Sequence, residues 1–125
     1  MMIQEIIDTL KTHPGLVARV GDRIYPFGIP PDTVQPAITY SLISDREVSS
    51  KDGPTGLHSG TFRFVVWSQS QDEGRQIVPV IGEALVWLRR RRILRNAVPG
   101  SASDDVFADP FAWLSTQTYT IWWKE

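Results

Sequence analysis

The arginines around residue 90 are the side chains whose type and spacing point most directly to chemistry. Arg89, Arg90, Arg91, Arg92 and Arg95 place five of the thirteen basic residues within seven positions. Guanidinium groups bind phosphate oxygens without reading base sequence, so the run is a candidate nucleic-acid contact. Cations at a helix C-terminus also complement the helix dipole and bond its free carbonyls. Because four consecutive residues wrap around more than one helical turn, they cannot all face one ligand, and we favour a solvated helix end or a subunit contact.

Side chains suited to catalysis or metal binding are few. The chain has no cysteine, which excludes disulfides, thiolate metal ligands and cysteine nucleophiles. Its two histidines, His13 and His58, do not form an HxH or HExxH spacing, and the GPTG segment at 53–56 lacks the Gly-Lys-Ser/Thr of a phosphate-binding loop. We therefore expect no catalytic residue, no metal site and no cofactor, and we expect that the protein is not an enzyme.

The acidic pairs have structural explanations. Asp72 and Glu73 follow Ser70 in a capping box, where the helix dipole favours negative charge. Asp104 and Asp105 lie in a segment rich in serine and glycine, and we expect them to be solvated. Neither pair indicates an active site.

Length and composition describe one ordinary domain over residues 1–125. The apolar share is 42%, the charged share is 22% and the net charge is −1, so the molecule as a whole is not a polyanion binder. No apolar run approaches the roughly 20 residues of a membrane-spanning helix, and we expect no membrane partner.

Helical periodicity appears in three places. Ile3, Ile6, Ile7 and Leu10 form one face of a helix over residues 2–11, and Pro14 opens a second short helix. The longest helix is predicted over about residues 71–89, with a buried stripe. That stripe contains Ile77, Ile81, Leu85 and Leu88.

Alternating apolar and polar residues predict strands at 37–45, 59–69 and from 113 to the end. Residues 22–26 form a short extended piece, and another is possible at 106–108. The polar segment 46–58 is predicted to be a long, flexible hairpin loop because it is rich in turn formers.

These elements predict an α+β fold. An antiparallel β-sheet of about four strands would carry the N-terminal helices and the one long helix on one face. The other face would expose Val65, Trp67, Ile43 and either Trp122 or Trp123. That much apolar surface predicts a partner interface.

Two stretches carry a family resemblance. RVGDRIYPFGIPPDTVQPAITYSLIS, residues 19–44, is followed by DGPTGLHSGTFRFVVWSQSQDEGRQIVPVIGEAL, residues 52–85. Together they resemble the tail-completion, or tail-terminator, proteins of long-tailed bacteriophages and prophages. The resemblance covers about residues 3–90 and consists of a diffuse pattern of helix, strand and loop residues rather than of a catalytic motif. The tetra-arginine is not part of it.

The resemblance implies a virion structural protein without an active site. Such a protein forms a ring, typically of six subunits, that caps the tail tube and joins the tail to the filled head. The implied partners are copies of itself, the tail-tube protein and the head-completion or connector protein, and DNA passes through without being read. The loop at Arg46–Ser59 would be mobile in the free protein and ordered in the ring.

Contact residues are expected on the hairpin loop, the exposed sheet face, the arginine run and an acidic patch. They are Arg46, Lys51, Asp52, Val65, Trp67, Arg89, Arg90, Arg91, Arg92, Asp104 and Asp105. The competing hypothesis is a small nucleic-acid-binding domain that uses the arginines as a basic patch.

Overall fold

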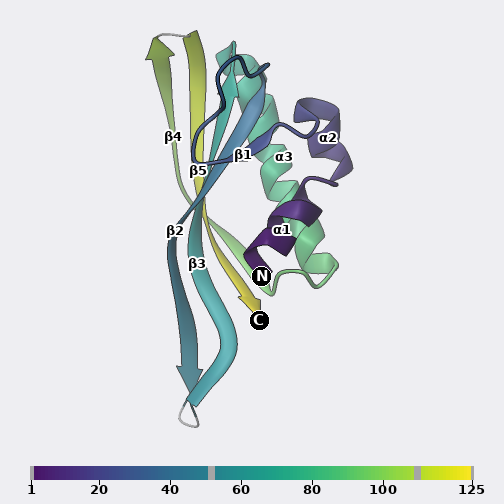
Figure 1. Ribbon diagram of the computed structural model, residues 1–125, viewed down its shortest axis with the longest axis vertical. Helices are drawn as coiled ribbons and strands as arrows, with labels where there is room; N and C mark the ends of the chain where they lie inside the picture. Colours follow the sequence, from purple (N-terminus) through teal and green to yellow (C-terminus); the bar gives the residue numbers. More distant parts are fainter. Residues whose placement is uncertain (1, 51–52, 109–110, 125) are drawn as a thin grey trace.

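The computed structural model describes residues 2–50, 53–108 and 111–124, which form two layers (Figure 1). Three helices lie in one layer: α1 (Met2–Leu10), α2 (Pro14–Val20) and α3 (Gln71–Arg90). The other layer is a sheet of five strands: β1 (Ile24–Pro26), β2 (Ala37–Ser50), β3 (Gly53–Ser68), β4 (Asn96–Ala108) and β5 (Phe111–Lys124). The predicted α+β class, with helices on one sheet face, is therefore confirmed.

The sheet is mixed, and it has one strand more than predicted. Its order is β1-β2-β3-β5-β4; β1 pairs with β2 in parallel, and the other pairs are antiparallel. The sequence predicts only a short extended piece at 106–108 in the segment after the arginines, but the whole segment forms β4. Its proline is tolerated because β4 is an edge strand, and a register shift between Pro99 and Ala102 absorbs the irregularity.

The prediction of a long loop at 46–58 is also wrong. β2 and β3 stay paired beyond it, with Arg46 opposite Ser59, Glu47 opposite His58 and Val48 opposite Leu57. Only Lys51 and Asp52, which lie outside the described residues, separate the two strands. Cross-strand pairing outweighs the weak strand propensity of these polar residues.

The outer part of this hairpin, residues 45–50 and 53–58, is called the hairpin arm below. β5 ends opposite Leu57, so the arm beyond that point is a two-stranded ribbon. Figure 1 shows the arm projecting past the other strands and past the helices.

The long helix begins as the sequence predicts. The Ser70 hydroxyl accepts a hydrogen bond from the Glu73 amide at 3.1 Å, while the Glu73 carboxylate accepts one from the Gln69 amide at 3.4 Å. The buried stripe of α3 then packs against the sheet and the other two helices. Among the described residues, none of the helices has the length and apolar character that a membrane crossing requires.

The core lies between α3 and the helix-facing side of β3 and β5. Its largest fully buried members include Phe62, Phe64 and Trp123. Trp123 therefore belongs to the core, and strand alternation places the half-buried Trp122 on the opposite side.

Candidate assembly surfaces

The sheet face that carries no helix is the first candidate surface, and it is called the open sheet face below. Val65 and Trp67 alternate with the buried Phe64 and Val66, so both point to this face as predicted. Trp67 lies across the sheet, and its indole Nε1 donates a hydrogen bond to the Thr39 hydroxyl at 3.1 Å.

The open sheet face carries the apolar residues that the sequence predicts, with Trp122 as the second of the two alternatives. Val65, Trp67 and Trp122 are half-buried, and Trp123 is on the other side. Their neighbours on β5 in the same face are Leu114, Thr116 and Thr118. The face therefore combines tryptophan, valine, leucine and threonine side chains with the exposed Arg63, a mixture that suits a protein contact better than a small-molecule site.

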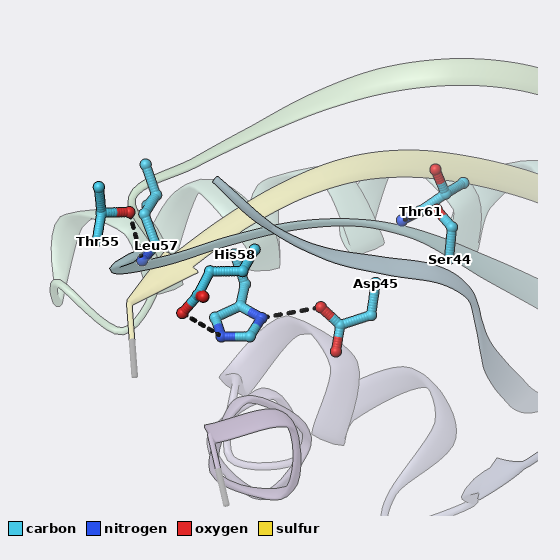
Figure 2. A network of polar contacts seen from close by, with 7 residues as sticks. Ser44, Asp45, Thr55, Leu57, His58 and Thr61 are labelled. Carbon is cyan, nitrogen blue, oxygen red and sulfur yellow. Dashed lines mark hydrogen bonds and ion pairs between the residues drawn. The ribbon is translucent and has the colours of Figure 1, made fainter. Parts of the chain in front are cut away.

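The root of the hairpin arm is held by a polar cluster that sequence reasoning missed. His58 Nδ1 lies 2.9 Å from the Asp45 carboxylate, and His58 Nε2 lies 4.0 Å from the Glu47 carboxylate (Figure 2). The imidazole also stacks on the buried Trp123, with ring centroids 5.5 Å apart and planes 15° apart. The cluster thus joins β2, β3 and β5 where the arm leaves the body.

Close packing at the same root requires a glycine. A Cβ added to Gly60 would lie 2.5 Å from the Ser44 carbonyl oxygen and 2.9 Å from Trp123 Cη2. Gly60 faces the β-bulge between Leu42 and Ser44. Close packing at Gly60 therefore constrains how the arm leaves the body, because no larger residue fits between the bulge and the indole.

The arginine run forms the C-terminal end of α3 and does not gather on one side. Arg89, Arg90, Arg91 and Arg92 are all exposed. The Arg91 guanidinium carbon lies 4.7 Å from the centre of the Trp87 ring, a cation–π contact.

The helix ends in a Schellman motif with an arginine in the position that usually holds glycine. Arg92 has φ 63, the Ile93 amide bonds the Leu88 carbonyl at 3.0 Å, and the Arg92 amide bonds the Arg89 carbonyl at 3.0 Å. A left-handed backbone at a residue with a side chain costs about 1–2 kcal/mol. The chain therefore keeps an exposed arginine here against a local conformational cost.

A groove runs beside this helix end, between α3 and β4, and is called the α3–β4 groove below. It has a volume of about 620 Å³, and Val86, Trp87 and Arg90 line it on the helix side. Tyr119 lies in its floor, where burial raises the pKa of the phenol. The rest of its lining is largely apolar, apart from His13 and Glu83.

The acidic residues lie beside the N-terminal end of α3. Asp104 is 3.9 Å from Arg75 of the first turns of α3, and Asp105 accepts a hydrogen bond from the Val106 amide at 2.7 Å. Arg75 and Arg90 both lie on α3, and the helix rise places their backbones about 22 Å apart. Within one subunit, Asp104 and Asp105 are therefore far from the arginine run.

No catalytic arrangement emerges from these surfaces. Within the described part of the chain, no group of three or more histidine, cysteine, aspartate or glutamate side chains could hold a metal ion. The His58 cluster joins strands and is explained by its structural role. Arg46 is exposed on the arm.

Comparison with known proteins decides the family. The model of the family described as "Tail completion protein gp17" matches residues 4–101. The chain belongs to the tail completion protein gp17 family. It is therefore a structural component of a phage-type virion, and the family resemblance noted in the sequence is confirmed.

A solved structure shows the same fold. One chain of the virion of a native gene transfer agent (GTA) particle superposes with a TM-score of 0.70 at 16% sequence identity. The match covers 96% of this tail completion chain and 92% of that chain. No curated protein sequence matches.

Proposed function

We propose that this tail completion protein assembles into a ring of about six subunits at the end of the tail tube and joins the tail to the head. The observation that carries the proposal is the asymmetry of the fold. Helices cover one sheet face, while the open sheet face carries the partly exposed Val65 and Trp67 and the arm projects past the body of the domain. Family membership supports the same proposal.

The energetics favour a ring held mainly by apolar contacts. Exposed ion pairs contribute about 0–1 kcal/mol each, so charges at the rim would orient subunits more than bind them. Val65 and Trp67 on the open sheet face supply apolar area. The arm, with the exposed Arg46 at its root, projects past the other strands and the helices and would contact a neighbouring subunit.

The partners follow from this position in the virion. One rim of the ring would dock on the tail-tube protein and the other on the head-completion or connector protein. DNA would pass through the centre without being read, because phosphate contacts carry no sequence information.

Electron microscopy of the protein mixed with purified tails tests the proposal. We expect ring-shaped density at one end of the tail tube. A protein that stays monomeric with tails and does not bind them would overturn the proposal. Salt-dependent DNA binding that is lost when Arg89, Arg90, Arg91 and Arg92 are all changed to alanine would favour a nucleic-acid-binding domain instead.

A further inference from the structure

The two ends of α3 carry opposite charge. Arg89, Arg90, Arg92, Arg95 and Lys124 are exposed at its C-terminal end, which we call the basic end. The opposite end, which we call the acidic end, is where β4 finishes. Its exposed acidic residues are Asp72, Asp104 and Asp105. Arg75 pairs with Asp104, and Arg19 lies beside Asp72. Figure 1 shows that β4 finishes near the N-terminal end of α3, at the other end of this helix from the arginines.

Each end also carries apolar surface beside its charges. At the basic end, the α3–β4 groove contains Trp87 and Tyr119, and Val86, which is 39% exposed, with Arg90 at the border. At the acidic end, Val106 is 46% exposed and follows Asp104 and Asp105 directly. One carboxylate, Glu83, also lines the groove, but the exposed arginines beside it leave this end positive overall. An acidic ribbon with an exposed valine therefore matches this end in net charge and in polarity.

We propose that the acidic end of one copy docks in the α3–β4 groove of the next. This inference rests on the proposed ring. Asp104 and Asp105 would face Arg89 and Arg90, and Val106 would enter the groove. One surface of each copy would contact a different surface of the next copy. This is a head-to-tail interface, the kind that generates closed rings.

A second copy fits the basic end better than a nucleic acid does. The four consecutive arginines point around the helix axis, and Arg91 is stacked on Trp87. The net charge of −1 leaves no general attraction for a polyanion. A flat basic track would bind DNA without an apolar groove, whereas a protein contact uses one.

Charge reversal and mixing test the inference. The basic-end variant carries Arg89→Glu with Arg90→Glu, and the acidic-end variant carries Asp104→Arg with Asp105→Arg. Each alone brings like charges together at every junction, so ring assembly on purified tails should fall at least about tenfold. The two variants mixed in equal amounts should restore assembly to within about threefold of wild type, because alternating copies match at every junction in a ring with an even number of subunits.

Two further variants sharpen the test. A control with Arg89→Lys and Arg90→Lys keeps both positive charges at the basic end and should assemble to within about threefold of wild type. Val106→Ser should weaken assembly several-fold without lowering the melting temperature, since the valine is already half exposed. Circular dichroism would confirm that every variant folds.

The outcomes separate the two claims. If wild type, the basic-end variant and the acidic-end variant all form rings equally well, the head-to-tail contact is wrong and the ring stands. If the mixture does not recover, the arginines bind something other than this acidic end. If wild type itself fails to assemble with tails, the proposed function is wrong.

Discussion

Replacing Gly60 with alanine should bend or detach the root of the hairpin arm. The new Cβ would meet the Ser44 carbonyl oxygen at 2.5 Å, Trp123 Cη2 at 2.9 Å and Leu42 Cδ1 at 3.0 Å. The leucine tip can rotate away. The other two contacts cannot yield cheaply, because one is backbone at a β-bulge and the other belongs to an indole that is 0% exposed.

The size of the effect follows from those contacts. Overpacking a rigid site costs about 1–3 kcal/mol, and two unyielding neighbours place Gly60→Ala near the upper end, at about 2–3 kcal/mol. For a domain of this size that corresponds to a melting temperature lowered by roughly 6–12 °C. Urea unfolding followed by tryptophan fluorescence would measure the loss as a lower midpoint with an unchanged slope.

A matched control is available in the same chain. A Cβ at Gly28 meets nothing within 4 Å, so Gly28→Ala should change the free energy of unfolding by less than about 0.5 kcal/mol. Adding Trp123→Phe to Gly60→Ala removes one of the two clashes, and the pair should lose less stability than the sum of the two single variants. The reasoning fails if Gly60→Ala is as stable as wild type, or if Gly28→Ala loses as much as Gly60→Ala.

Three further outcomes are expected. Arg92→Gly should raise the free energy of unfolding by about 0.5–1 kcal/mol in a urea titration, because glycine adopts the left-handed backbone without strain. Arg89→Gly lies inside the helix and should lower the free energy of unfolding by about 1 kcal/mol. Changes of the same sign in both variants would contradict this. Trp67→Ala should cost about 1–2 kcal/mol of stability, since the ring is only half-buried, yet it should reduce assembly on tails more than tenfold; an unchanged ring would remove Trp67 from the interface. Burial raises the pKa of Tyr119 in the folded state. The contribution of the neutral phenol to stability is therefore complete below pH 10, the ordinary tyrosine pKa, and is lost as the pH rises above it. Tyr119→Phe should reduce the fall of the melting temperature at alkaline pH, and an unchanged fall would contradict this role of Tyr119.

The parts of the fold with strong local signals could be predicted from the sequence. The capping box at Ser70 and the apolar stripe place α3 to within one residue of its observed end at Arg90. Alternation along β3 also assigns Val65 and Trp67 to the open sheet face correctly. In each case the residues themselves specify the period and the direction of the side chains.

The strands that form only by pairing with segments distant in the sequence could not be predicted from the sequence. β4 and the arm contain serine, glycine, aspartate and proline, which locally favour turns, and they become strands only because β5 and the opposite half of the hairpin pair with them. The His58 cluster was missed for the same reason. Asp45 and Glu47 approach the imidazole only through the cross-strand register.

The conformation of the arginine run also lay beyond sequence reasoning. The prediction of a helix end was sound, but nothing local indicates that Arg92 rather than a glycine adopts φ 63. Whether the eleven predicted contact residues touch a neighbour remains a prediction. Lys51 and Asp52 among them lie outside the described residues.

The central claim is that this chain forms a ring at one end of the tail. Cryo-electron microscopy of tails purified without this protein, before and after adding it, tests the claim most directly. The account predicts new ring density with about six-fold symmetry at one end of the tube, into which the fold fits with its arm against a neighbour. Tails whose two ends look the same with and without the protein would contradict it.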